Sequence, residues 1–434
     1  MDLSFDRASK PLCGEFSPAG DKSLAHRAAL FAALAEGESE ISSFPDSGVT
    51  RAMLGALGAL GVESSLDGGV LRVKGTGARR FPREGAVAQC GNSGTTMRLL
   101  AGALAMTGSA ARLDGSAGLR RRPMSRILEP LAQMGAEASS AGGFAPLDFK
   151  ARDASKPLAP FDGSIPVASA QVKSCLILAA LAASGESVIR EPGPSRDHTE
   201  RMLSAMGADV AAAPDAAPCA VRVKPLSRPL EPLHCRLAGD ISSAAFILAA
   251  AAIVPGSRVT VRSCGINPGR TGILDCLSAM GADVSISGRT VSAGEPVGDI
   301  TLRSGALKGM EIGGDLVVRT IDEFPALAVA AAFAEGETAV RGAEELRYKE
   351  TDRIAAIVRS LRALGAEAEE TPDGFRISGG TLKGGTADAG GDHRLAMSMS
   401  LAGLRSPERV TVRNAEILSE SFPGFESAVK SLAV

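Results

Sequence analysis

The sequence predicts an α/β protein of two similar domains, each containing three copies of one structural unit. Three observations predict this fold class: a repeated alanine-rich helical run, a second repeated helix motif, and a shared beginning of the first and fourth copies. The alanine-rich runs begin near Ser23, Thr95, Ser169, Ser242, Asp322 and His393. The intervals between them are 72, 74, 73, 80 and 71 residues, an even spacing that indicates a repeated fold unit.

Each unit is expected to contain two helices and about four short strands. A β-branched segment follows each alanine-rich run, as in "ESEISSF", "SRVTVRS" and "ERVTVRN", and most runs end in a Gly-x-Ser or Gly-x-Thr stop. A second helix ends in Leu or Met, then Gly, then Ala or Val. The glycines of this motif are Gly61, Gly135, Gly207, Gly281 and Gly365. They are expected to be left-handed helix caps, because glycine adopts a positive φ without steric cost.

The first and fourth units begin alike, with "AGDKS" at Ala19 and "AGDISS" at Ala238. This similarity predicts a duplication into three units plus three units. The predicted boundaries are 21–237 for the first domain, 1–20 plus 238–434 for the second, and 18–21 and 236–240 for the crossings, with Gly20 and Gly239 as hinges. Low sequence complexity explains the pattern less well, because two independent motifs keep the same spacing.

Composition excludes several classes of function. The net charge of -2 with no Trp and one Tyr argues against nucleic acid as a partner. The seven cysteines are scattered without a CxxC, which is typical of reduced thiols and predicts neither disulfides nor a metal site. The apolar run from Ala244 is too short to span a bilayer, and the first ten residues lack a signal-peptide core. We therefore expect a cytoplasmic protein with no metal, no cofactor and no membrane partner.

Polar residues gather where the alanine-rich helices begin. The segment "PAGDKSLAHRAALFAAL" places Lys22, Ser23 and Arg27 at one such start. A helix N-terminus already attracts anions, so added positive charge there predicts a bound anion such as a phosphate. Serine and aspartate at these positions are most often simple N-caps. Arg27 and Arg98, however, lie on otherwise apolar helical faces, where an unpaired charge costs several kcal/mol.

Several segments together resemble the 5-enolpyruvylshikimate-3-phosphate (EPSP) synthase family. They are "GDKSLAHRA", "GNSGTTMR", "RRPM", "SAQVKS", "SRDHTE", "DEFPALAVAAA", "ELRYKETDR" and "GDHRLAM", in the family's order across nearly the whole chain. The resemblance implies the enolpyruvyl transferase fold, an inside-out α/β barrel of two domains with three βαβαββ units each. It also implies transfer of the enolpyruvyl group of phosphoenolpyruvate to the 5-hydroxyl of shikimate 3-phosphate, with release of phosphate. This is a step of the shikimate pathway toward chorismate and aromatic amino acids and the target of glyphosate. Members are usually monomeric.

The resemblance also implies the roles of individual residues. Those expected to bind shikimate 3-phosphate are Lys22, Ser23, Arg27, Ser169, Ala170, Gln171, Ser195, Arg196, Asp322 and Lys349. Those expected to bind phosphoenolpyruvate are Lys22, Asn92, Gly94, Thr95, Arg122, Gln171, Arg353 and Arg394. The catalytic residues are expected to be Lys22, Asp322 and Glu350. We interpret Glu350 as the group for the carbon proton, Asp322 for the hydroxyl proton and Lys22 for the leaving phosphate.

The sequence departs from the family at Glu420, where many members have Lys, and at Ala170 and Leu99. One alternative is the transferase that acts on UDP-N-acetylglucosamine, which has the same fold. That family usually has Asn after the first lysine and a reactive Cys before Arg-Pro. Here Ser23 follows Lys22, and no Cys occurs between residues 91 and 174. A non-catalytic repeat scaffold and an RNA-processing protein with related repeats are more distant interpretations.

Overall fold

The described residues form six small β-sheets, and five of them share one strand order. The computed structural model describes residues 1–153, 155–213 and 215–433, and for Glu420 only the backbone. The chain divides into two compact units. Unit 1 consists of Met1–Pro18, Gly239–Thr290 and Pro296–Val434, and unit 2 of Ala19–Ala238 and Val291–Glu295. No helix of the described ranges has both the length and the apolar character needed to cross a membrane.

The second repeat of unit 2 illustrates the pattern. It runs β6 (Ala86–Gln89), α3 (Gly94–Thr107), β7 (Ala111–Asp114), α4 (Ser125–Gln133), β8 (Ala138–Ala141) and β9 (Phe144–Phe149), with the 3₁₀ helix η1 (Leu119–Arg121) before α4. β6 pairs in parallel with β7, and the hairpin β8–β9 continues the sheet in the order β6-β7-β9-β8. The predicted βαβαββ unit is therefore confirmed.

The other two repeats of unit 2 have the same strand order. The third contains β10 (Asp162–Ser164), α5 (Ala170–Ala180), β11 (Ser187–Arg190), α6 (His198–Ala205), β12 (Val210–Ala212) and β13 (Ala220–Val223). The first contains α1 (Lys22–Leu34), β3 (Glu36–Ser42), α2 (Gly48–Ala59), β4 (Glu63–Asp67) and β5 (Val70–Thr76). Its parallel edge strand is β14 (His234–Arg236), from the far end of the unit's sequence.

Unit 1 repeats this arrangement. Its fourth repeat has β2 (Cys13–Phe16), α7 (Ile241–Ile253), β15 (Arg258–Gly265), α8 (Gly272–Ala279) and the long hairpin β16 (Asp283–Ser292) and β17 (Glu295–Arg303). The fifth has β18 (Glu311–Ile312), α9 (Asp315–Thr320), α10 (Phe324–Ala332), β19 (Glu337–Val340), η2 (Glu344–Tyr348), α11 (Arg353–Ala363), β20 (Glu367–Thr371) and β21 (Gly374–Ser378). The sixth has β22 (Gly385–Asp388), α12 (His393–Leu401), η3 (Ala402–Leu404), β23 (Val410–Arg413), η4 (Ala415–Glu420) and α13 (Phe425–Leu432), and β1 (Leu3–Phe5) completes its sheet.

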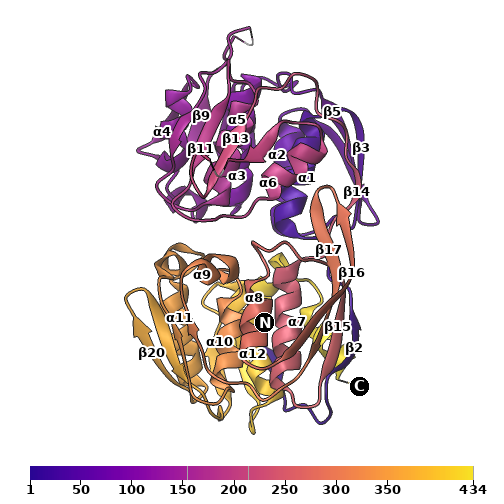
Figure 1. The fold of residues 1–434 in the computed structure, drawn as a ribbon, viewed down its shortest axis with the longest axis vertical. Helices are drawn as coiled ribbons and strands as arrows, with labels where there is room; N and C mark the ends of the chain where they lie inside the picture. The colour runs from indigo at the N-terminus through magenta and orange to yellow at the C-terminus, as the bar shows by residue number, and fades with distance from the viewer. Residues whose placement is uncertain (154, 214, 434) are drawn as a thin grey trace. The chain divides into compact units, whose positions relative to one another are not determined.

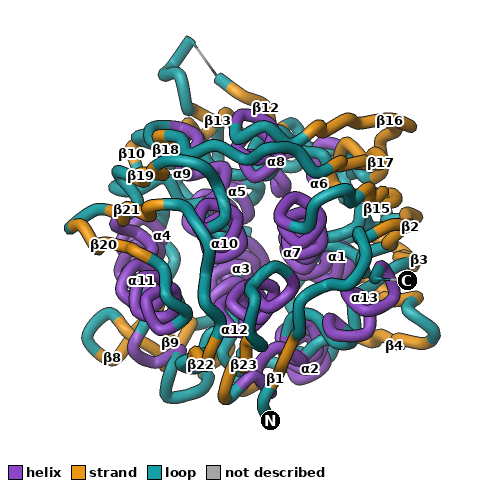
Figure 2. The backbone as a smooth tube through the Cα atoms, turned by 90° about the horizontal axis from the view of Figure 1, so that it is seen from below, coloured by secondary structure: helices purple, strands orange, loops and turns teal. Residues whose placement is uncertain are grey.

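The alanine-rich helices form the interior of each unit. In unit 1, α7, α10 and α12 lie inside their strands in both views (Figures 1 and 2). Every residue of α7 except Ser243 is buried, which explains why this helix is apolar on all sides. In unit 2, a Cβ on Gly102 of α3 would lie 2.4 Å from the carbonyl oxygen of Cys175 on α5. Small residues thus let the interior helices approach one another closely.

The repeated glycines behave largely as expected. Gly61, Gly135, Gly207, Gly281 and Gly365 have φ values of 91, 90, 90, 112 and 91°, so the left-handed caps are confirmed. The Gly-x-Ser stops are less uniform. Gly108 caps α3 directly with a φ of 67°, whereas Gly37 already lies within strand β3. There the chain passes from α1 to β3 through Ala35 alone, so the glycine belongs to the strand.

Candidate active site

The first two turns of α1 carry three predicted site residues of unit 2. Asp21 caps this helix, because its carboxylate accepts hydrogen bonds from the backbone N–H groups of Ser23 (2.7 Å) and Leu24 (3.0 Å). Lys22 and Ser23 follow the cap as the first helical residues, and Arg27 lies one turn further. The cap therefore fixes the backbone from which the Lys22 ammonium and the Ser23 hydroxyl project at the positive end of the helix dipole.

Arg27 joins three helices. Its guanidinium is buried and donates to Thr199 Oγ1 on α6 (2.7 Å), to Ser174 Oγ on α5 (3.0 Å) and to the Ser23 carbonyl oxygen (3.0 Å). Burial lowers the pKa of Arg27 to about 10, with the charge of Glu200 opposing the shift, so the group stays positive at neutral pH. These three acceptors are neutral oxygens, which hold the guanidinium in place without cancelling its charge.

The starts of α3 and α5 are linked in the same way. Arg98 Nη1 donates to Gln171 Oε1 (2.5 Å), and Gln171 Nε2 donates to Thr95 Oγ1 (2.9 Å). A Cβ on Gly94 would lie 3.0 Å from Arg98 Nη1 and 3.1 Å from Arg122 Nη1. Glycine at this position therefore lets two guanidinium groups approach the first turn of α3.

Positive charge accumulates around this turn. Burial, together with the neighbouring charges of Arg122 and Arg126, lowers the pKa of Arg98 to about 10. Arg98 also donates to the Pro123 carbonyl oxygen at 3.2 Å. Its two acceptors, this carbonyl and the Gln171 side chain, are both uncharged. An anion is the ligand that such a group of arginines favours.

The remaining predicted residues of unit 2 lie at neighbouring helix starts. Ser169 is the N-cap residue of α5, and Ala170 and Gln171 are its first helical residues. Ser195 and Arg196 lie in the turn before α6, where Ser195 Oγ donates to Glu191 Oε2 at 2.8 Å. Asn92 precedes the cap of α3, and its Oδ1 accepts from Ser116 Oγ at 3.0 Å. The structure therefore places Asn92 and the Ser169–Gln171 segment at the beginnings of α3 and α5, as the sequence predicts, and places Ser195 and Arg196 shortly before α6.

In unit 1, Arg353 gathers three carboxylates. Its guanidinium is 1% exposed and lies 2.7 Å from Asp392 Oδ2, 2.6 Å from Glu350 Oε2 and 3.5 Å from Asp322 Oδ1. These residues come from the starts of three helices, α10, α11 and α12. Burial would lower the pKa of Arg353, but the charges of Glu350, Asp392 and Asp322 outweigh it and raise that pKa.

Asp322 also contacts the other predicted basic residues of unit 1. Its Oδ1 lies 3.7 Å from the Lys349 ammonium, and its carbonyl oxygen accepts a hydrogen bond from Arg394 Nη1 at 2.9 Å. Arg394 Nη1 also lies 3.7 Å from Glu323 Oε1. The structure therefore brings together Asp322, Lys349, Glu350, Arg353 and Arg394, all the site residues predicted in unit 1.

A small group of potential metal ligands lies in unit 2. Asp197, His198 and Glu295 have donor atoms close enough to hold a metal ion. Arg201 Nε lies 2.7 Å from Asp197 Oδ2, and His198 Nδ1 lies 2.8 Å from Glu295 Oε1. Both carboxylates therefore already have hydrogen-bonding partners within the chain.

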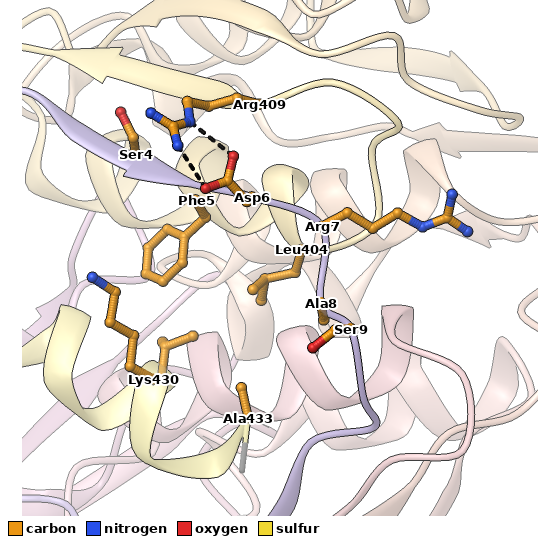
Figure 3. Close-up of a pocket in the computed structure, with 11 residues that line it drawn as sticks. Ser4, Phe5, Asp6, Arg7, Ala8, Ser9, Leu404, Arg409, Lys430 and Ala433 are labelled. Carbon is orange, nitrogen blue, oxygen red and sulfur yellow. Dashed lines mark hydrogen bonds and ion pairs between the residues drawn. The ribbon is translucent and has the colours of Figure 1, made fainter.

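Figure 3 shows a pocket of unit 1 between the N-terminal segment and α13, where Asp6 pairs with Arg409. The lining of this pocket includes Phe5, Leu404 and Lys430. None of the residues that line this pocket is a predicted site residue. The pocket therefore shares no residue with the predicted site residues at the helix starts of unit 2 or with those around Arg353 in unit 1.

Sequence reasoning missed the groups that support the predicted residues. Ser174 and Thr199 hold Arg27, and Lys173 forms ion pairs with Glu191 (2.7 Å) and Glu200 (2.8 Å) inside unit 2. Their partners are 18 to 172 positions away in sequence, so no local pattern marks them. A lysine in the middle of the apolar run "AQVKSCLILAA" was the one available signal, because such a charge requires a buried partner.

Arginines and lysines at several helix starts, beside carboxylates that can exchange protons, indicate an enzyme that acts on anionic substrates. The comparisons with known proteins agree. The family model for EPSP synthase (3-phosphoshikimate 1-carboxyvinyltransferase) matches residues 7–429. A 3-phosphoshikimate 1-carboxyvinyltransferase of Geobacter metallireducens is 46% identical over 430 residues, covering 98% of each chain. One from a Synechococcus species is 46% identical over 422 residues, covering 95% of each.

The solved structures of EPSP synthase from Acinetobacter baumannii are also similar. One has a TM-score of 0.89 and 37% sequence identity, and the match covers 99% of this chain and 98% of that one. The chain belongs to the EPSP synthase family. The predicted family, two-domain inside-out α/β fold, transferase activity and shikimate pathway are thereby confirmed, and the UDP-N-acetylglucosamine alternative is not supported.

Proposed function

We propose that this chain transfers the enolpyruvyl group of phosphoenolpyruvate to the 5-hydroxyl of shikimate 3-phosphate and releases phosphate. The observation that carries the proposal is that two carboxylates, Asp322 and Glu350, pair with one buried guanidinium, that of Arg353. Carboxylates of this kind can exchange protons with a substrate, while the adjoining Lys349 and Arg394 supply positive charge for anionic groups.

Shikimate 3-phosphate is proposed to bind mainly through unit 2. Arg27, Ser195 and Arg196 would hold its phosphate, together with Ser23 and the start of α5 at Ser169, Ala170 and Gln171. The support is chemical: a phosphate offers acceptor oxygens, and these residues present a guanidinium, hydroxyls and backbone N–H groups at helix starts. Lys22, Asp322 and Lys349 are proposed to contact the ring and its hydroxyl groups.

Phosphoenolpyruvate is proposed to bind mainly through arginines. Arg122 in unit 2 and Arg353 and Arg394 in unit 1 are the candidates, because a guanidinium can grip a carboxylate or a phosphate with two parallel hydrogen bonds. Asn92, Gly94, Thr95 and Gln171 would line its pocket, and Gly94 leaves room beside two guanidinium groups. Lys22 would contact both substrates.

The proposed reaction is an addition followed by an elimination. In the addition, the 5-hydroxyl loses its proton as its oxygen bonds to C2 of phosphoenolpyruvate, and C3 gains a proton. In the elimination, C3 loses a proton, the C2–O bond to phosphate breaks, and the departing phosphate is protonated. Asp322 is proposed for the hydroxyl proton, Glu350 for the carbon proton and Lys22 for the phosphate.

The remaining proposals concern the whole chain. We infer two domains, 21–237 and 1–20 plus 238–434, with hinges near 18–21 and 236–240. We further infer a monomer that works in the cytoplasm. We also infer that it needs no metal or cofactor, because both substrates bring the reacting groups themselves.

The test is phosphate release by the purified chain with both substrates and with each omitted in turn. Release that requires both establishes the reaction. Asp322→Ala and Glu350→Gln are expected to reduce kcat by roughly 10²- to 10⁴-fold. The matched control is Glu344→Gln, which changes an exposed carboxylate of η2 and should leave kcat unaltered. Folded protein that releases no phosphate with both substrates would refute the proposal.

A further inference from the structure

Lys173 forms a buried ionic cluster behind the helix starts of unit 2. It lies on α5 one turn after Ser169, and its ammonium is 2.7 Å from Glu191 Oε2 and 2.8 Å from Glu200 Oε1. The three side chains are 4, 2 and 10% exposed. A group so enclosed is poorly placed to touch a substrate, so any effect on the reaction must pass through the residues that surround it.

Lys173 is the main counter-charge for both carboxylates. The second oxygens, Glu191 Oε1 and Glu200 Oε2, accept no hydrogen bond from the described residues. Burial raises the pKa of Glu200, and the charge of Lys173 opposes that rise. Without the ammonium, two carboxylates would remain buried near each other, an arrangement that is strongly unfavourable.

Each carboxylate is connected, directly or through a neighbouring residue, to a residue that we propose binds shikimate 3-phosphate. Glu191 Oε2 accepts the hydrogen bond of Ser195 Oγ (2.8 Å), and the Lys173 ammonium lies 3.5 Å from the Ser195 carbonyl oxygen. On the other side, Glu200 follows Thr199, the acceptor for Arg27 Nε. Ser174, the residue after Lys173, accepts from Arg27 Nη2 at 3.0 Å and lies 2.6 Å from Thr199 Oγ1.

The charges of the set balance. Lys173 and Arg27 contribute two positive charges, and Glu191 and Glu200 contribute two negative charges. Glu200 is also the carboxylate with the largest influence on Arg27. If Lys173 lost its charge, the uncompensated glutamates would draw Arg27 and the Ser195 turn toward the interior, away from a ligand at the helix starts.

We propose that Lys173 is a positioning residue for the phosphate of shikimate 3-phosphate. Lys173 forms ion pairs with both glutamates. Ser195 and Arg27 thereby keep the orientation in which they can bind that phosphate. This inference rests on the proposed function of those two residues. It predicts that loss of Lys173 weakens binding of shikimate 3-phosphate much more than it changes kcat or the KM for phosphoenolpyruvate.

The test compares the full-length wild type with Lys173→Met and with the double variant Lys173→Met/Glu200→Gln. Removing one charge of each sign keeps the cluster balanced, so the double variant should fold even if the single variant does not. In the double variant Glu191 still lacks the Lys173 ammonium, so Ser195 should be displaced there as it is in the single variant. Both variants are expected to raise the KM for shikimate 3-phosphate roughly ten- to hundredfold, as a displacement of about 1 Å can do. The matched control is Lys224→Met, which removes the exposed ion pair of Lys224 with Asp209.

Phosphate release gives KM and kcat for each substrate, and calorimetry gives the Kd of shikimate 3-phosphate alone. A folded double variant with the wild-type KM and Kd for shikimate 3-phosphate would overturn the inference, as would equal losses for both substrates. If the wild type itself neither bound shikimate 3-phosphate nor released phosphate, the proposed function would fail instead, and the two failures are thus distinguishable.

Discussion

Replacing Gly102 by alanine is expected to force α3 and α5 apart and to destabilise unit 2. The added Cβ would lie 2.4 Å from Cys175 O and 2.8 Å from Cys175 Cα, whereas ordinary contact begins at 3.4 Å. The obstacle is backbone in the middle of a buried helix, which cannot rotate aside as a flexible side chain can. The two helices must therefore separate by about 1 Å near this point.

The size of the effect follows from two opposing contributions. Overpacking a close-packed interior costs about 1–3 kcal/mol, and the rigid backbone at Cys175 favours the upper end of this range. Alanine in a helix interior recovers about 0.5–1 kcal/mol relative to glycine. The net loss in the free energy of unfolding is about 2 kcal/mol, which corresponds to a fall in Tm of about 4–8 °C for a unit of this size.

Thermal and urea unfolding of the variant measure this loss directly. Gly55→Ala is the matched control, because Gly55 is a mid-helix glycine of α2 with nothing within 4 Å of an added Cβ, and it should gain about 0.5–1 kcal/mol. The Thr95–Gln171 hydrogen bond joins the starts of the same two helices, so Gly102→Ala should also raise KM for the substrates. A Gly102→Ala protein as stable as the wild type would refute the close-packing argument.

Three further predictions concern the charged and tightly packed helix starts. Asp392→Asn removes a fully buried partner of Arg353 and should cost about 3 kcal/mol at pH 7. Because Arg353 outweighs burial and lowers the pKa of Asp392, this contribution is present above the unfolded pKa and lost as pH falls through the folded pKa. Urea unfolding at a series of pH values should show the gap to the wild type closing below about pH 4. Burial lowers the pKa of His26 to about 4, so the unfolded chain binds an extra proton between about pH 4 and 6.5. Wild-type stability should fall by about 3 kcal/mol over that interval on acidification, and His26→Asn should flatten the curve; equal slopes would contradict this. Gly94→Ala places a Cβ at 3.0 Å from a guanidinium and should raise KM for phosphoenolpyruvate with little change in Tm, which steady-state kinetics and a melting curve can check.

The repeat architecture could be predicted because its signals are local. Each unit marks its helices by apolar runs and its caps by glycines, and Gly61 and Gly207 have nearly equal φ values, 91 and 90°, although 146 residues separate them. The clustering of Lys22, Gly94 and Asp322 at helix starts was predictable for the same reason, since each follows a recognisable helix boundary. Their family motifs then supplied expectations of role that no pattern of polarity contains.

The rest depends on contacts between distant parts of the chain. Nothing in the sequence indicates that His234–Arg236 completes the sheet of Glu36–Ser42, because a three-residue strand has no period of its own. Likewise, the apolar run around Lys173 shows that this charge needs a partner but does not identify Glu191 and Glu200. Pairwise burial of opposite charges is a property of the folded chain, and a sequence read in short windows does not contain it.

Strands that pair with distant parts of the sequence impose an order on folding while the chain is being synthesised. Leu3–Phe5 pairs with Val410–Arg413, with Leu3 opposite Val412, and Cys13–Phe16 pairs with the strand that begins at Arg258. At about 5–20 residues per second, the first strand waits about 20 to 80 s before its partner is translated. During that time the strand Leu3–Phe5 must stay unpaired, while 19–238 already contains all three sheets of its own unit. Nascent chains should therefore acquire protease resistance in two stages, the first soon after residue 238 emerges and the second only after release.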